Sequence, residues 1–243
     1  MNLKLGGIRD TILNDSIVLL PAYREPAGVR LVIRELRDIF DPFILVIDRP
    51  AGDYTGYNAW KMGATVLTQK SRGKGAAIRD ALEFLEYRGL NHKYVIMIDA
   101  DYTYPAKHIP EMIGVLESNP DVGMVCGRRP GNRDFDRFHL GNHLLRFVHF
   151  LLNGIKIRDP CTGLRIIRYD IMKNWRPKSR GFDIECEINH FINKIKGFKI
   201  VEIPIEYRDR IGEKKLSVRH GATILRRILL MTINSLVSRH NIF

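Results

Sequence analysis

Cysteine is scarce in this sequence of 243 residues. The three cysteines, Cys126, Cys161 and Cys186, are odd in number and far apart, so they match neither a disulfide framework nor the paired ligands of a zinc site. We therefore expect the protein to work in a reducing, intracellular compartment.

Long apolar runs are also absent. No stretch of about 18 or more uncharged apolar residues occurs, which is the length that a membrane-spanning helix needs. Residues 1–16 mix Lys4, Arg9 and Asp10 with apolar residues, unlike a secretory signal peptide. We expect a cytoplasmic protein that contacts a membrane from one side without crossing it.

Acidic residues are too few to balance the basic ones. Lys and Arg number 39 against 27 Asp and Glu, which leaves a formal charge of +12 and a pI of about 9.8. Such an excess favours an anionic partner, namely nucleic acid, acidic lipid headgroups or a phosphorylated substrate, although a merely basic surface is an alternative. Nucleic acid is the least favoured, because the aromatic residues are not interleaved with the basic runs as a base-stacking surface requires.

The first half of the sequence alternates short apolar runs with helix-period segments. The apolar runs predict buried strands at residues 17–20, 43–47, 65–67, 94–98 and 122–126. Residues 27–40 and 107–118 carry apolar side chains at the spacing of amphipathic helices. Strands that alternate with helices predict an α/β fold with a mostly parallel sheet covered on both faces.

The pattern changes after about residue 128. The sequence then predicts a polar, Arg-rich loop at 128–137, helices at 138–152, 182–196 and 222–237, and strands at 164–168 and 199–205. No repeat, low-complexity segment or Pro/Gly linker divides the chain. We expect one domain over residues 1–243, with a nucleotide-sugar-binding half at about 16–127 and an acceptor side at about 128–243.

Acidic side chains follow three of the predicted strands. They are Glu25, Asp48, Asp99 and Asp101. Because ligands bind outside the carboxyl ends of strands in open α/β sheets, these acids predict one polar site, although each taken singly also fits an ordinary cap or turn. Asp99 and Asp101, one residue apart, can share Mg²⁺ or Mn²⁺, which would neutralise a leaving diphosphate.

A basic, glycine-rich segment, Arg72-Gly73-Lys74-Gly75, opens a predicted helix at 76–87. Glycine amides and a lysine at the start of a helix predict an anion site. The spacing is not that of a P-loop, so an ATPase is not indicated. A flexible turn with solvated charges is the alternative.

The ordered set of motifs resembles a known family. Leu20-Pro21-Ala22-Tyr23-Arg24-Glu25, Val46-Ile47-Asp48, Gly73-Lys74-Gly75-Ala76 and Ile98-Asp99-Ala100-Asp101 look like the family 2 glycosyltransferases. Later motifs are similar to those of dolichyl-phosphate mannose synthases and related polyprenyl-phosphate sugar synthases. These are Gly127-Arg128, Asp159-Pro160-Cys161-Thr162-Gly163-Leu164-Arg165, Gly181-Phe182-Asp183-Ile184-Glu185, Ile203-Pro204-Ile205 and Asp209-Arg210-Ile211-Gly212-Glu213-Lys214-Lys215-Leu216-Ser217.

The resemblance covers roughly residues 16–217 and implies a GT-A fold. It implies inverting, metal-dependent transfer of one sugar from a GDP- or UDP-linked donor to a polyprenyl (dolichyl) phosphate, as in protein glycosylation, at the cytoplasmic face of a membrane. The implied donor site comprises Pro21, Tyr23, Glu25, Asp48, Lys74, Asp99, Ala100, Asp101, Arg210 and Lys215.

The resemblance also implies a role for most of these residues. Pro21, Tyr23, Glu25 and Asp48 would hold the base and ribose, Asp99 and Asp101 the metal and diphosphate, and Arg210 with Lys215 would close over the phosphates. Arg128 and Arg137 would receive the acceptor phosphate, and the implied catalytic residues are Asp101, Arg128 and Arg210.

The sequence departs from the family pattern at two positions near the acids. Ile47 precedes Asp48, where the family often has two adjacent acids, and this leaves the base of the donor open. Thr103 stands where some relatives carry Gln, and this leaves the completion of the metal shell open.

A phosphate acceptor also fits on chemical grounds. A phosphate monoester is mostly a dianion at neutral pH, so it is already a nucleophile and needs cations rather than a base. The arginines of loop 128–137 could supply those cations, or could form a solvated basic loop. A second hypothesis, transfer to a soluble or sugar-hydroxyl acceptor, would need a general base from among Asp183, Glu185 and Glu187, with Asp183 or Glu185 favoured, although acids in a first turn also suit the helix dipole.

The predicted helices at 138–152 and 222–237 combine apolar residues with flanking arginines. Such helices are typical of a lipid interface. A core helix or a helix between copies of a homo-oligomer would show the same pattern, so both interpretations remain open.

Overall fold

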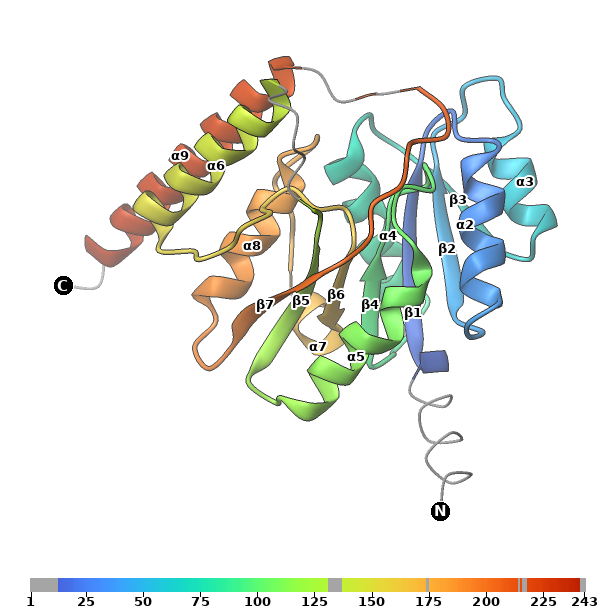
Figure 1. Ribbon diagram of the computed structural model, residues 1–243, viewed down its shortest axis with the longest axis horizontal. Helices are drawn as coiled ribbons and strands as arrows, with labels where there is room; N and C mark the ends of the chain where they lie inside the picture. The colour runs from blue at the N-terminus through green and yellow to red at the C-terminus, as the bar shows by residue number, and fades with distance from the viewer. Residues whose placement is uncertain (1–12, 131–136, 174, 214, 216–217, 241–243) are drawn as a thin grey trace.

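The computed structural model describes residues 13–130, 137–173, 175–213, 215 and 218–240. For residues 137–142, 218–219 and 234–240 only the backbone is described. Its centre is a seven-stranded sheet with helices on both sides (Figure 1). The strands are β1 (Ser16–Ala22), β2 (Phe43–Asp48), β3 (Thr65–Thr68), β4 (Tyr94–Met97), β5 (Val122–Arg128), β6 (Arg165–Arg168) and β7 (Lys199–Pro204).

The strand order is β3-β2-β1-β4-β6-β5-β7. Strand β6 runs antiparallel to both β4 and β5, and every other pair in the sheet is parallel. The prediction of a mostly parallel sheet is confirmed. The sequence pattern did not reveal the reversed direction of β6, because a buried strand has the same apolar run in either direction.

The helices are α2 (Gly28–Arg37), α3 (Thr55–Lys61), α4 (Lys74–Tyr87), α5 (Ile109–Ser118), α6 (Arg137–Asn153), α7 (Tyr169–Met172), α8 (Ile184–Lys194) and α9 (Val218–His240), with a 3₁₀ turn at Ala106–His108. The short helices α3 and α7 were not predicted. Helices α2, α4 to α6, α8 and α9 lie where the sequence pattern predicts them, with ends that differ by a few residues.

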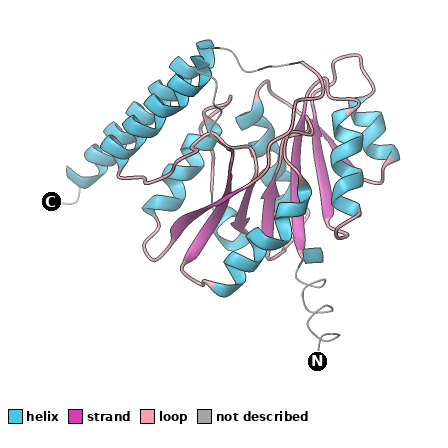
Figure 2. Ribbon diagram, in the orientation of Figure 1, coloured by secondary structure: helices cyan, strands magenta, loops and turns pink. Residues whose placement is uncertain are grey.

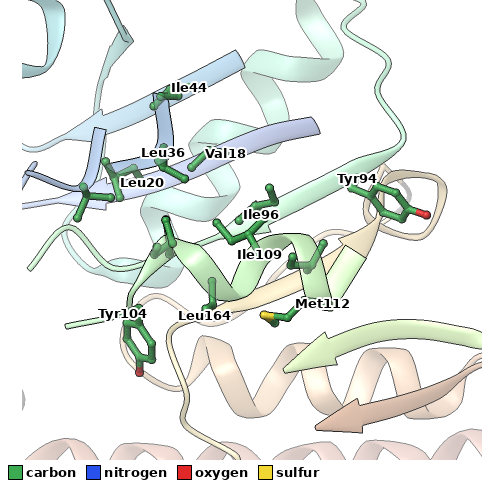
Figure 3. Packing of buried hydrophobic residues seen from close by; sticks show 14 of the residues in the cluster. Val18, Leu20, Leu36, Ile44, Tyr94, Ile96, Tyr104, Ile109, Met112 and Leu164 are labelled. Atoms are coloured by element: carbon green, nitrogen blue, oxygen red, sulfur yellow. The ribbon is translucent and has the colours of Figure 1, made fainter. Parts of the chain in front are cut away.

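Two apolar layers cover the sheet, one on each face. Val18 and Leu20 of β1 pack with α2 and α5 in one layer, which Figure 3 shows from close by. Ile17 and Leu19 point to the other face and pack with α4 and α8. Because successive side chains in a strand point to opposite faces, a strand covered on both sides must be apolar at every position. This requirement explains the uninterrupted apolar runs of the sequence.

Helices α6 and α9 form a further layer outside α8. They lie side by side and extend away from the sheet (Figure 1). Leu145 of α6 and Ile224 and Ile228 of α9 pack there against Cys186 of α8. No helix in the described ranges is both long enough and apolar enough to span a bilayer.

A loop after β7, which we call the strap (residues 205–213 and 215), crosses the sheet toward α2 (Figure 2). Its backbone is tied to the segment after β4, because Arg208 N–H donates to Thr103 O at 2.9 Å and Ile211 N–H to Asp101 O at 3.1 Å. The strap therefore lies against the acids that the sequence placed after β4.

Candidate functional site

The carboxyl ends of β1, β2 and β4 meet at one edge of the sheet. In the register of β1 with β2, Ala22 lies opposite Asp48, and Leu19 of β1 lies opposite Met97 of β4. Asp99 and Asp101 follow β4 within four residues of Met97. The acids that follow three strands in the sequence are thus gathered at one edge, as expected.

Asp99 is bound to a buried lysine. Lys74 Nζ lies 2.6 Å from Asp99 Oδ1 and 2.5 Å from Glu185 Oε1. Burial would raise the pKa of Asp99, but the Lys74 ammonium outweighs it and holds that pKa below its usual range. Burial alone would lower the pKa of Lys74, and the two carboxylates reverse that shift. Asp99 is therefore ionised, and Lys74 joins α4, the segment after β4, and α8.

The glycines around Lys74 permit a close approach of two backbones. Gly75 N–H donates to Gly181 O and Ala76 N–H to Arg180 O, each at 3.1 Å. Gly73 has a φ of 110°, and a Cβ there would overlap the carbonyl of Arg180. The motif predicted as an anion loop thus holds the Lys74 side chain against Asp99.

Asp101 has both carboxylate oxygens engaged. Thr103 donates to Oδ1 from its hydroxyl at 2.6 Å and from its backbone N–H at 3.1 Å, and Arg210 of the strap lies 2.6 Å from Oδ2. Burial and the nearby charge of Asp99 raise the pKa of Asp101 above its usual value. Thr103, which departs from the family pattern, therefore fixes the orientation of this carboxylate.

The strap also reaches Glu25, which follows β1. Lys215 forms an ion pair with the buried Glu25 carboxylate, and Gly212 lies against the same group. Burial raises the pKa of Glu25, although Lys215 opposes the shift. The structure thus brings Arg210 and Lys215 to this edge of the sheet, where they neutralise carboxylates.

Asp48 lies at the end of β2 beside the start of α3. Burial raises the pKa of its carboxyl to about 6, with a further contribution from the charge of Asp53, while the N–H of Gly56 opposes the shift. Among the described residues, Asp48 Oδ1 is buried and has no hydrogen-bond partner. An unsatisfied buried acceptor is costly to a fold, so it marks a place where a ligand donor would fit.

Other residues of the expected donor site lie along β1 and after β4. Pro21 lies in β1 opposite Ile47 of β2. The Tyr23 ring is half-buried under the Arg24 guanidinium, whose carbon is 5.4 Å from the ring centroid. Ala100 O lies against Gly28, the first residue of α2, where a side chain would not fit.

The two arginines at the end of β5 have different surroundings. Arg129 binds Asp159 through two hydrogen bonds of 2.7 Å and stacks on the Tyr207 ring at 5.5 Å. The half-buried Arg128 side chain has no hydrogen bond or ion pair within the described ranges. Of Arg137 only the backbone is described, at the start of α6, and residues 131–136 lie outside the described chain, so the expected acceptor role of Arg137 stays a prediction.

The acids considered as general bases are engaged elsewhere. Asp183 pairs with Arg227 of α9 at 2.9 Å, and Glu187 accepts the N–H groups of Lys178 at 2.7 Å and Ser179 at 2.6 Å. The Asp183 contact fixes α9 to the start of α8, and the Glu187 contacts fix the loop before α8. These specific contacts account for the presence of the two acids better than a favourable interaction with the helix dipole does. The Oε1 atom of Glu185 binds Lys74, and its Oε2 atom is buried without a partner in the described chain.

Sequence reasoning missed the arginine that shapes the turn before β6. The fully buried Arg165 donates to Thr162 O at 2.9 Å, Pro160 O at 2.8 Å and Asn189 Oδ1 at 2.5 Å. This turn places Gly163 so close to the Asp99 carboxylate that no side chain would fit. The available signal was an arginine inside the apolar run 164–167.

Asp99 and Asp101 fit a divalent cation that is completed by a ligand. Burial and the repulsion from Asp99 raise the pKa of Asp101, and a bound cation would relieve that repulsion. The described residues contain no group of three or more His, Cys, Asp or Glu side chains that could enclose a metal. Mg²⁺ is commonly held by one or two carboxylates together with phosphate oxygens and water, so these residues suit a site that forms with the donor.

The sequence is similar to a known protein family and to two named transferases. The model for glycosyl transferase family 2 matches residues 17–176. The chain is 28% identical over 220 residues to a dolichyl-phosphate hexose transferase of Haloferax volcanii, covering 87% of this chain and 91% of that protein. It is 22% identical over 246 residues to a UDP-N-acetylglucosamine–dolichyl-phosphate N-acetylglucosaminyltransferase of Methanococcus voltae, covering 90% of this chain and 97% of that protein.

The fold is also that of a solved transferase. Glucosyl-3-phosphoglycerate synthase from Mycobacterium tuberculosis, crystallised with Mn²⁺, uridine diphosphate and phosphoglyceric acid, matches with a TM-score of 0.70 and 19% identity. The match covers 94% of this chain and 81% of that one, and at this identity it shows the fold alone, which is GT-A. With its family match over most of the sheet and the acids gathered at the strand ends, the chain belongs to glycosyl transferase family 2.

Proposed function

We propose that this glycosyltransferase moves one sugar from a GDP- or UDP-linked donor to a polyprenyl (dolichyl) phosphate at the cytoplasmic face of a membrane, with Mg²⁺ or Mn²⁺. The names of the two relatives support a dolichyl-phosphate acceptor. The metal-bound and uridine diphosphate-bound crystal structure of a protein with the same fold supports the metal and a nucleotide donor.

One observation carries the choice of a phosphate acceptor. The acids proposed as general bases, Asp183, Glu185 and Glu187, each bind a cation or backbone N–H groups, whereas Arg128 has no partner among the residues described. A phosphate dianion needs a cation to hold it and no base to activate it. A hydroxyl acceptor would instead require a free general base to take its proton.

The proposed reaction is a direct displacement. An acceptor phosphate oxygen forms a bond to the anomeric carbon as the bond from that carbon to the diphosphate breaks, and the nucleoside diphosphate leaves. Arg128 holds the acceptor, and Arg210 and Lys215 exchange their carboxylate partners for diphosphate oxygens. A cation at Asp99 and Asp101, when bound, supplies further neutralisation of the leaving group.

The membrane location rests on the outer helix pair. Leu144, Phe147 and Leu151 of α6 are 53%, 60% and 65% exposed, and Leu229 and Ile233 of α9 are 44% and 54% exposed. Apolar side chains of this size on adjacent helices favour a lipid interface. The polyprenyl chain of the acceptor requires the enzyme to reach that interface.

The test is release of nucleoside diphosphate from a panel of UDP- and GDP-sugars, with and without a polyprenyl phosphate. We expect turnover that depends on the lipid. An Arg128→Gln variant should raise KM for the lipid on the order of 10- to 100-fold, since a hydrogen bond to a charged group contributes about 1.5–3 kcal/mol, while KM for the donor stays unchanged. Arg88→Gln, an exposed arginine on another surface, is the matched control.

The Oε2 atom of Glu185, which has no hydrogen-bond partner in the described part of the chain, favours one alternative, transfer to a hydroxyl of a soluble or sugar acceptor. Phosphoglyceric acid, bound by the structural neighbour, is such an acceptor candidate. Turnover that ignores the lipid, is unaffected by Arg128→Gln and is lost in Glu185→Gln would establish this alternative and reject the phosphate acceptor.

A further inference from the structure

A surface hollow of about 360 Å³ lies between α6 and the segment 155–158. Arg146, Phe147 and Phe150 of α6 form one wall, Lys156 and Arg158 form the other, and Glu202 of β7 also lines it. None of these residues belongs to the site at the ends of β1, β2 and β4. Glu202 lies two residues before Pro204, the register partner of Arg128, so the hollow adjoins the proposed acceptor side.

The hollow has an excess of positive charge. The side chains of Arg146, Lys156 and Arg158 are exposed, and within the ranges that the structure describes none of them forms an ion pair. Among the described residues that line the hollow, the one acid is Glu202, and it is already engaged, because its two carboxylate oxygens accept the N–H groups of Arg158 at 2.7 Å and Asp159 at 2.8 Å. Three cations therefore face one carboxylate that is already hydrogen-bonded, an arrangement that suits an anionic ligand.

The same hollow is continuous with the apolar face of α6. Phe147 and Phe150, which line it, are 60% and 46% exposed, and Leu151 beside them is 65% exposed. Aromatic and aliphatic side chains next to Arg and Lys match the boundary between acyl chains and headgroup phosphates. A free inorganic anion would make no use of this apolar rim.

We propose that this hollow binds the phosphate headgroups of anionic membrane phospholipids, so that α6 docks on acidic bilayers with the Arg128 end of the sheet at the surface. The inference rests on the membrane location in the proposed function and adds the class of lipid. It assigns to Arg146, Lys156 and Arg158 a docking role separate from binding of the acceptor.

The experiment is sedimentation of the full chain with vesicles of phosphatidylcholine, alone or with phosphatidylglycerol, without donor or acceptor. We expect tighter binding to the anionic vesicles. The triple variant Arg146→Gln, Lys156→Gln, Arg158→Gln should weaken that binding on the order of a hundredfold. The control Arg30→Gln, Lys61→Gln, Arg88→Gln removes the same charges from exposed positions elsewhere and should change it little.

Equal losses in the two triple variants, or none in the first, would overturn the proposal. A parallel assay with detergent-dispersed polyprenyl phosphate separates docking from transfer. In that assay the variant with all three hollow residues replaced should have the KM of the wild type for the acceptor. A raised KM in the detergent assay, without a loss of vesicle binding, would assign the hollow to acceptor binding instead. If the wild type transfers no sugar yet binds anionic vesicles through these residues, the proposed function fails and the docking site stands.

Discussion

At the scale of single residues, the site contains buried carboxylates of two kinds. Asp159 has its negative charge matched by Arg129, whereas Asp48 has one oxygen with no partner in the described chain. Removal of one member of a buried ion pair leaves the other charge uncompensated and destabilises the fold, whereas a buried acceptor without a partner already reduces stability until a ligand arrives. The two acids should therefore respond in opposite ways to removal of their charge.

Asp48→Asn should stabilise the protein at neutral pH. The folded-state pKa of Asp48, about 6, lies above the usual value, so the wild type loses stability as pH rises through that range. The variant avoids this loss and should gain about 1–3 kcal/mol at pH 8 but nothing near pH 4. Urea unfolding at both pH values measures the difference, and an equal effect at both would contradict the assignment.

Asp159→Asn should destabilise the protein by about 3–5 kcal/mol at neutral pH, because Arg129 would remain largely buried without its partner. Burial would raise the pKa of Asp159, but Arg129 outweighs it and lowers that pKa. The stabilisation is thus complete above the ordinary carboxyl pKa of about 3.9 and disappears as pH falls through the lower folded value.

The control for this prediction is Asp170→Asn. Asp170 pairs with Lys173 at 2.8 Å, and the two side chains are 83% and 48% exposed. An exposed pair contributes about 1 kcal/mol at most. If the free energy of unfolding falls by the same amount in the two variants, burial does not make the Asp159–Arg129 pair more important to stability than the exposed pair.

The sequence predicted the acids of the site better than their partners. Glu25, Asp48, Asp99 and Asp101 were recognisable because each follows a buried strand, which is a local property. The contacts of Lys74 with Glu185 and of Asp183 with Arg227 join residues far apart in the chain. Such pairings depend on how α4, α8 and α9 pack, and no local pattern encodes that.

At the scale of elements, the strap brings two cations, Arg210 and Lys215, to the acids of the site. Arg208 holds it in place, since its guanidinium stacks on the Tyr102 ring at 4.3 Å and binds Glu35 of α2 at 2.7 and 2.8 Å. Tyr102 has a φ of 66°, which is rare for a residue with a side chain. Strain of this kind persists where the surroundings enforce it, often at functional sites.

Tyr102→Leu should loosen the strap, because the loss of a cation–π contact of about 0.5–2 kcal/mol weakens the hold on the Arg208 guanidinium, which keeps its bonds to Glu35, and so weakens the positioning of Arg210. We expect a several-fold higher KM for the donor and faster tryptic cleavage within the strap. Tyr102→Phe keeps the ring and should resemble the wild type in both assays. If Phe and Leu behave alike, the ring does not position the strap.

The direction of strands was less predictable than their existence. Apolar runs identified every strand of the sheet to within a few residues, yet β6 was not recognised as antiparallel. Helix α3 was missed because it is short and polar, with Tyr54 beside it and Tyr57 and Trp60 within it all exposed, so no apolar face marks it.

At the scale of the whole molecule, binding of donor and metal should appear as thermal stability. A nucleoside diphosphate at about 100 times its Kd adds about 2.7 kcal/mol, which corresponds to a rise in Tm of about 5–10 °C for a protein of this size. We expect this rise with UDP or GDP plus Mn²⁺, and a smaller one when a chelator is present. Scanning fluorimetry measures it.

The variant Asp101→Ala tests whether this carboxylate is responsible for the part of the Tm rise that depends on Mn²⁺. The variant should lose the metal-dependent part of the shift, with each shift measured from the variant's own Tm without nucleotide. A shift that is the same with chelator, or unchanged in the variant, would contradict a metal at Asp99 and Asp101.

The place of β6 in the sheet has a consequence for biosynthesis. Strand β6 lies between β4 and β5 although it follows both in the chain, so the facing edges of these two strands have no partner until residues 165–168 leave the ribosome. Unpaired strand edges invite association with other chains. Nascent chains stalled before residue 165 should therefore be held by chaperones, and chains extended past β6 should be released.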